Sequence, residues 1–126
     1  MLYRIAYQSQ PTVPVTLQLV NGIVTVARKR NAAAGITGFL TFRPEWFLQV
    51  LEGEQEAVCR LFADIGKDRR HCGVTLLEHR AIARREFPTW SLGARLAPVG
   101  LQGHAALAAL RVISEGSYNT RPANVL

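Results

Sequence analysis

The sequence predicts an α+β domain whose elements follow the order strand, helix, strand, strand, helix, strand, strand and a last helix. Two observations support this fold class. Five short segments alternate or concentrate apolar residues as strands do, whereas three segments repeat them at helical spacing. The chain has 126 residues, of which 48% are hydrophobic, which suits one packed domain and excludes a disordered chain.

The first half of the chain predicts a strand, a helix and a two-stranded hairpin. The expected elements are a strand over residues 2–9, a helix over 17–30 capped by Thr16, a turn over 31–35, and strands over 36–42 and 46–51 joined by a turn at 43–45. Apolar residues of this helix fall in two stripes, and one stripe is enough to pack on a sheet. The second stripe indicates that another apolar surface lies beside the helix.

The second half predicts a helix, two strands and a C-terminal helix. The expected elements are a helix over residues 53–67, a strand over 74–87 with a bulge or bend at Glu78–His79, a strand over 90–96 and a helix over 104–115. The first six elements match the ferredoxin-like arrangement, in which a mixed sheet carries two helices on one face. The C-terminal helix is therefore expected on the other face.

The organisation of the chain and its composition exclude several classes of protein. We expect a core over residues 1–97, a capping helix region over 98–116 and a disordered tail over 117–126, with no room for a fused output domain. No apolar run approaches the ~20 residues that span a bilayer, and the start of the chain lacks the features of a signal peptide. Cys59 and Cys72 are too few for a disulfide framework, which predicts a cytoplasmic protein with reduced thiols.

The chain is basic, with 15 Lys and Arg against 9 Asp and Glu and a net charge of +6. The basic residues form short clusters near the expected ends of elements, where cations suit helix C-termini or protect strand edges. We therefore expect no nucleic-acid partner and no membrane partner.

Four residues stand out because they carry polar atoms, could be buried and have no obvious partner in the sequence. Gln49 lies in the middle of an apolar strand, and a buried amide without a partner costs about 1–3 kcal/mol. Tyr7 and Trp90 have the strand parity to face the same space between sheet and helices, and Asn31 follows the first helix. Each also has an ordinary interpretation, as a core residue or a helix cap. Together they predict a pocket for a flat, mostly apolar molecule with a polar edge.

Five stretches surround or follow these residues: LYRIAYQSQ around Tyr7, RNAAAGITGFLTF around Asn31, FLQVLEG around Gln49, DRRH from Asp68 to His71 and RREFPTWS ending at Trp90 and Ser91. Taken together, the stretches resemble a known family, the BLUF domains, which are flavin-binding sensors of blue light. They keep the order and spacing of the family over residues 2–93. The family fold is the ferredoxin-like one predicted above.

This resemblance implies that FAD is held between the two helices on one sheet face. Tyr7 is similar to the photoactive tyrosine of the family, Gln49 to the glutamine between that tyrosine and flavin N5, and Asn31 to the asparagine at the polar edge of the ring. The cofactor-binding residues implied are Tyr7, Ile23, Asn31, Gln49, Asp68 and Arg70, and the photoactive residues implied are Tyr7, Gln49 and Trp90. The resemblance further implies a photoreceptor that is not an enzyme, that self-associates, and that signals in trans to a protein partner.

Two departures from the family pattern bear on this interpretation. Leu92 stands where the family usually has Met, and we expect Trp90 and Leu92 to share one strand face, so that either could flank Gln49. Asp64 stands where some relatives carry a basic residue that faces the flavin tail, which leaves the cluster at residues 28–30 as the candidate for the phosphates. The alternative is a BLUF fold that has lost flavin and acts as a protein-interaction module.

Three further alternatives come from other classes. An RNA-recognition signature places its aromatic residues two apart on one face, whereas Phe39 and Phe42 are three apart and point to opposite faces. A hydrolase would need a nucleophile or phosphate motif that this sequence lacks. A metal site would draw on residues whose spacing matches no common zinc pattern, namely Cys59, His71, Cys72 and His79.

Overall fold

The computed structural model describes residues 1–115 of the chain. The elements are β1 (Leu2–Pro11), α1 (Leu17–Ala34), β2 (Thr37–Arg43), β3 (Trp46–Glu54), α2 (Gln55–Ile65), β4 (His71–Ala81), β5 (Gly93–Leu96), α3 (Gly103–Ala108) and α4 (Leu110–Glu115). The strands form one five-stranded sheet in the order β4-β1-β3-β2-β5, in which β2 and β5 are parallel and the other neighbours antiparallel. This mixed sheet confirms the predicted ferredoxin-like α+β fold.

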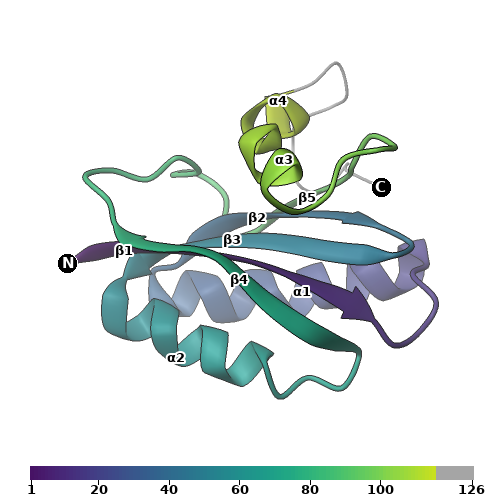
Figure 1. Ribbon diagram of the computed structural model, residues 1–126. Coiled ribbons are helices and arrows are strands. Elements are labelled where there is room, and N and C mark those ends of the chain that lie inside the picture. The colour runs from purple at the N-terminus through teal and green to yellow at the C-terminus, as the bar shows by residue number, and fades with distance from the viewer. Residues whose placement is uncertain (116–126) are drawn as a thin grey trace.

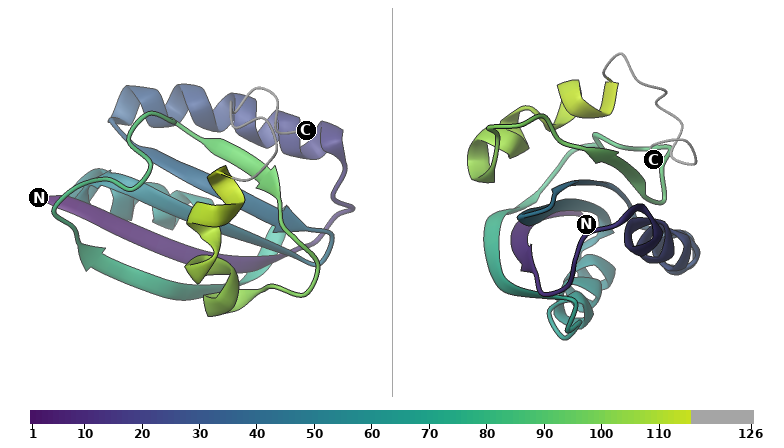
Figure 2. Two further views of the ribbon diagram at one scale, coloured as in Figure 1. Left: turned by 90° about the horizontal axis from the view of Figure 1, so that it is seen from above. Right: turned by 90° about the vertical axis from the view of Figure 1, so that its right-hand side faces the viewer.

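The sheet separates two layers of helices, as Figures 1 and 2 show. We call the side covered by α1 and α2 the pocket face and the side covered by α3 and α4 the far face. Successive residues of a strand point to opposite faces, so the same strands supply both. Buried strand residues of the pocket face include Ile5, Tyr7, Leu40, Phe47, Gln49 and Leu51, and those of the far face include Ala6, Phe39, Trp46, Leu48 and Val50.

Helix α1 begins where expected and ends later. The Thr16 side chain accepts a hydrogen bond from the Leu19 N–H at 3.1 Å and caps the first turn. The expected turn over residues 31–35 is wrong, because three alanines after Asn31 are strong helix formers and continue the helix to Ala34. The helix ends at Gly35, whose φ of 69° is the left-handed conformation that glycine adopts without strain.

The strand expected over residues 74–87 is also different: β4 starts at His71 and ends at Ala81, and β5 is only four residues long. The segment between them, residues 82–92, has no regular structure, and we call it the 82–92 loop. The pairing of β4 with β1 jumps by one residue between Glu78 and Leu76, which leaves a bulge at Leu77. The predicted bulge therefore exists, one residue before the expected position.

Buried polar side chains hold the 82–92 loop to the sheet. The Glu52 carboxylate is fully buried and accepts the backbone N–H groups of Glu86 and Phe87 at 2.9 and 3.0 Å, together with Nη1 of Arg4 at 2.8 Å. Arg85 donates to the backbone oxygens of Glu52 and Gly35 and to the Thr37 hydroxyl. These charge-assisted bonds replace the ladder that a longer strand would have made.

The expected C-terminal helix is present as two short helices, α3 and α4, which pack on the far face through Ala106, Leu110 and Ile113. Helix α3 ends at Ala108, and Ala109 forms a turn before α4 begins at Leu110. The tail predicted over residues 117–126 lies outside the described residues, and the domain boundaries at 97 and 116 stay predictions.

Candidate functional site

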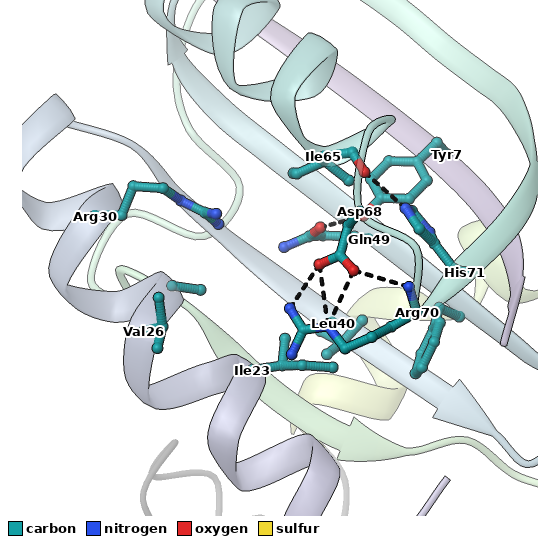
Figure 3. Close-up of a pocket in the computed structure, with 12 residues that line it drawn as sticks. Tyr7, Ile23, Val26, Arg30, Leu40, Gln49, Ile65, Asp68, Arg70 and His71 are labelled. Carbon is teal, nitrogen blue, oxygen red and sulfur yellow. Dashed lines mark hydrogen bonds and ion pairs between the residues drawn. The ribbon is translucent and has the colours of Figure 1, made fainter. Parts of the chain in front are cut away.

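A pocket opens on the pocket face between α1 and α2, above strands β1, β2 and β3 (Figure 3). Its apolar wall combines residues of both helices and two strands, namely Ile23, Val26, Ala27, Leu40, Phe47 and Ile65. Its polar lining is Tyr7, Arg30, Gln49, Asp68, Arg70 and His71. The second apolar stripe predicted on the first helix consists of Leu19, Ile23 and Val26, and two of these residues, Ile23 and Val26, line the pocket.

Tyr7 and Gln49 meet inside this pocket because β1 and β3 pair them directly in register. The Tyr7 Oη donates to Gln49 Oε1 at 2.5 Å, and the two side chains are 4% and 5% exposed. Burial raises the pKa of the Tyr7 phenol, so the hydroxyl keeps its proton at physiological pH. The hydrogen-bond partner expected for a buried Gln49 is therefore the Tyr7 phenol. The amide N–H₂ group of Gln49 is left for a ligand in the pocket.

Asp68 and Arg70 form the polar end of the pocket, after α2. The Arg70 side chain donates to both carboxylate oxygens of Asp68, at 2.6 to 3.1 Å, and the Arg70 backbone N–H adds a further bond at 2.9 Å. The hydrogen bonds from Arg70 lower the pKa of Asp68 to about 2. The pair thus presents a fixed carboxylate and a fixed guanidinium side by side in the pocket lining.

His71 lines the pocket as well, although the sequence analysis assigned it no flavin role. Its Nε2 lies 2.7 Å from the Ile65 carbonyl and therefore donates to it, while Nδ1 lies 2.7 Å from the Ser9 hydroxyl. Its ring meets the Tyr7 ring nearly edge-on at a centroid distance of 6.2 Å. The sequence did contain a signal for His71 as a pocket residue, because it ends the DRRH stretch that holds the predicted residues Asp68 and Arg70.

Asn31 is fully buried on α1 but does not line the pocket. Its Nδ2 donates to the Ser91 carbonyl at 2.7 Å, so one of its two amide hydrogens is used by the 82–92 loop. Its Oδ1 lies 3.4 Å from the neighbouring Arg30 Nε. Asn31 lies inside α1 and the αL position is Gly35, so the helix-cap interpretation of Asn31 is wrong, while its role at the flavin edge stays a prediction.

The expectation that Trp90 shares a strand face with Leu92 and flanks Gln49 is wrong. Trp90 lies in the 82–92 loop before β5 begins, and its ring packs on the far face against Phe39 and Phe87 at centroid distances of 5.4 and 6.5 Å. Leu92 is fully buried on the pocket face, against residues of α1 and β2. The prediction from strand parity is wrong here because β5 begins only at Gly93, after both Trp90 and Leu92.

The donor set suits a flat ring system with an amide-like edge. Aliphatic and aromatic side chains form the apolar lining, while Gln49 and the Asp68–Arg70 pair add hydrogen-bond donors and acceptors to it. Asp64 is exposed and does not line the pocket, so its carboxylate stands away from the ring site. The residues present therefore fit a flavin.

The metal alternative finds no support in the described part of the chain. Cys59 and Cys72 are both exposed free thiols, and no group of three or more His, Cys, Asp or Glu side chains within residues 1–115 is placed to hold a metal ion. No helix in the same range is long and apolar enough to cross a membrane.

Comparison with known proteins gives the class of this fold and site. The family model described as "Sensors of blue-light using FAD" (BLUF) matches residues 2–93, and the chain belongs to this family. It is 36% identical over 92 residues to photoactivated adenylate cyclase subunit beta of Euglena gracilis, covering 72% of this chain and 11% of that protein. It is 34% identical over 86 residues to the blue light- and temperature-regulated antirepressor BluF of Escherichia coli (strain K12), covering 68% of this chain and 21% of that protein.

Two solved structures are similar over almost their whole length. The ground state of BlsA has a TM-score of 0.82 and 30% identity, covering 94% of this chain and 91% of that one. The dark state of BlrB, a BLUF protein, has a TM-score of 0.81 and 28% identity, covering 93% and 97%. The chain spans only about a tenth to a fifth of the length of the curated relatives named above. The matched region, residues 2–93, is thus a BLUF domain, of the family described as sensors of blue light using FAD.

Proposed function

We propose that this chain is a blue-light photoreceptor that binds FAD in the pocket between α1 and α2 and responds through Tyr7 and Gln49. The single observation that carries the proposal is the buried 2.5 Å hydrogen bond from the Tyr7 hydroxyl to Gln49 Oε1 inside the pocket of a BLUF domain. A redox-active phenol is there joined to an amide that has one donor end and one acceptor end.

Bound flavin would supply light absorption and, once excited, a strong one-electron oxidant. With flavin in the pocket, Tyr7 would supply the electron and would pass its phenolic proton along its hydrogen bond to Gln49. The Gln49 amide would then exchange its donor and acceptor ends by rotation or by tautomerisation, and Tyr7 would regain its electron and its proton. Atoms and electrons balance over the cycle, so the lasting change is the direction of the hydrogen bonds that Gln49 makes. Near-complete burial of Tyr7 and Gln49 excludes water from this exchange.

Signalling in trans to a protein partner, self-association and a cytoplasmic location are parts of the same proposal. Exposed apolar side chains outside the pocket, among them Leu96, Val99 and Val112, offer surface for protein contacts. The two exposed free thiols, Cys59 and Cys72, suit a reducing compartment. Light scattering in the dark and under blue light measures the association directly.

The test is an absorption spectrum of the protein reconstituted with FAD, in the dark and after blue light. We expect a flavin band that shifts reversibly to longer wavelength. Gln49→Leu should retain the band and lose the shift, because Leu has neither end of an amide, whereas Gln18→Leu on the exposed side of α1 should behave as wild type. A protein that takes up no FAD would favour the flavin-free interaction module instead, and a normal shift in Gln49→Leu would refute the role of Gln49.

A further inference from the structure

The backbone carbonyls of residues 90–92 all accept hydrogen bonds from elements that carry the pocket. Gly38 N–H donates to the Trp90 carbonyl at 3.0 Å, Asn31 Nδ2 to the Ser91 carbonyl at 2.7 Å and Arg28 Nε to the Leu92 carbonyl at 3.1 Å. Within these three residues the chain passes from the far face, where Trp90 packs, to the pocket face, where Leu92 is buried. A hydrogen bond therefore fixes the backbone at each of the three residues that cross from one face to the other.

Arg28 belongs to the basic cluster at residues 28–30, but its three members do different things. Arg30 lines the pocket and extends toward it from α1 in Figure 3. Lys29 is exposed. Arg28 is half-buried and does not line the pocket, and its Nε donates a hydrogen bond to the Leu92 carbonyl. Its Nη2 is buried without a hydrogen-bond partner among residues 1–115, so the Leu92 carbonyl is the polar contact that orients this side chain.

The position of the Leu92 backbone matters for the pocket because its side chain stands behind the pocket wall. Leu92 is fully buried in one apolar cluster with Ala27, Leu40 and Phe47, and these three residues line the pocket. A close-packed cluster transmits the displacement of one member to the others. Arg28 and Asn31 are three residues apart on α1 and so share a helix face, which lets them hold two consecutive carbonyls.

We infer that Arg28 is a positioning residue of the light-sensing site: it fastens the Leu92 carbonyl to α1, next to the Ser91 carbonyl that Asn31 holds, and thereby sets the pocket wall, and it does not bind the flavin phosphates. The effect on the photocycle rests on the proposed function, whereas the fastening of the backbone does not. If the basic cluster binds the flavin phosphates, the residues that contact them are Lys29 and Arg30.

The experiment compares Arg28→Met with Lys29→Met. Both changes remove one positive charge from neighbouring helix positions and keep an unbranched side chain with good helix propensity, but only the first removes the donor to Leu92. Three quantities are measured: hydrogen exchange of the peptide covering residues 90–96, the ratio of the dissociation constants of FAD and riboflavin, which lacks phosphates, and the rate at which the light-induced shift decays in the dark.

For Arg28→Met we expect exchange over residues 90–96 to accelerate about tenfold, as the loss of one net hydrogen bond predicts, with no change in peptides from β1 and β3. The FAD-to-riboflavin ratio should stay unchanged and the dark decay should change several-fold, whereas Lys29→Met should leave exchange and decay as in wild type. A purely global destabilisation would accelerate exchange throughout and leave the decay rate unaltered.

Selective loss of FAD affinity in Arg28→Met, unchanged exchange, or equal effects of the two variants on exchange would each overturn the inference. If wild type binds no flavin, the proposed function fails, while the exchange comparison still decides whether Arg28 fastens the loop. Should Arg28→Met fail to fold, Arg28→Gln makes the same comparison with a polar head that suits a half-buried position.

Discussion

The two faces of the sheet are built from alternate residues of the same strands but are packed in opposite ways. On the far face Phe39, Phe87 and Trp90 stack with centroid distances of 5.4 to 6.5 Å. On the pocket face Tyr7 and Gln49 meet through a hydrogen bond beside a lined hollow. The far face therefore holds the aromatic packing that stabilises the fold, and the pocket face has the polar, incompletely filled interior that a cofactor site needs.

The largest expected effect on stability comes from removing an aromatic ring of the far face. Phe39→Ala should lower the free energy of unfolding by about 3–5 kcal/mol, because it removes a fully buried ring that contacts two others. The same change at Phe62, a partly exposed ring on the pocket side that contacts Tyr7, should cost clearly less. Chemical denaturation of both variants measures this difference, and equal losses would show that the two faces are packed alike.

Tyr7→Phe should act on the pocket face with a smaller effect on stability and a complete effect on function. It leaves Gln49 Oε1 without its donor, which costs about 1 kcal/mol, and it should abolish the light-induced shift while flavin remains bound. Tyr3→Phe removes the hydroxyl that lies 3.2 Å from His79 on the surface and serves as the control, with a normal shift. A normal photocycle in Tyr7→Phe would place the electron donor elsewhere.

Leu92→Met tests the segment in which the chain crosses from the far face to the pocket face. The swap preserves volume and should cost less than about 1.5 kcal/mol in unfolding free energy. We expect the light-induced shift to survive in both forms and the light-dependent hydrogen exchange of β5 to be larger with Met, since its thioether is flexible and accepts hydrogen bonds. Equal exchange responses in the two proteins would show that the thioether is dispensable here.

The smallest expected effect concerns acid stability at the pocket edge. Because the hydrogen bonds from Arg70 lower the pKa of Asp68 to about 2, the pair stabilises the folded state fully above the ordinary Asp pKa near 4 and loses this contribution as the pH falls through about 2. Asp68→Asn should remove a small, salt-screened part of the acid dependence of the urea midpoint, because the carboxylate is partly exposed. Asp64→Asn, at an exposed site outside the pocket, is the matched control. An unchanged acid profile in Asp68→Asn would show that the pair adds nothing to stability.

Some features of the site could be predicted because they depend on local periodicity. Tyr7 and Gln49 each lie inside a long strand, so the period of two placed them on the face of the helices, and antiparallel pairing then brought them into register. The element order and the apolar stripe of α2 have the same origin. Asp68 and Arg70 were found through the BLUF resemblance, since their two-residue spacing in a loop has no periodicity of its own.

The placement of Trp90 and Asn31 was decided by tertiary structure alone. Trp90 lies outside β5, so no strand period governs it, and its ring fits the far face because Gly93 has no side chain: a Cβ there would lie 2.4 Å from Trp90 Cε3. Asn31 finds its partner 60 residues away in Ser91. Local sequence determines which face a residue of a regular element points to, whereas the path of the 82–92 loop depends on hydrogen bonds to distant groups such as the buried Glu52 carboxylate, which exist only once the sheet has formed.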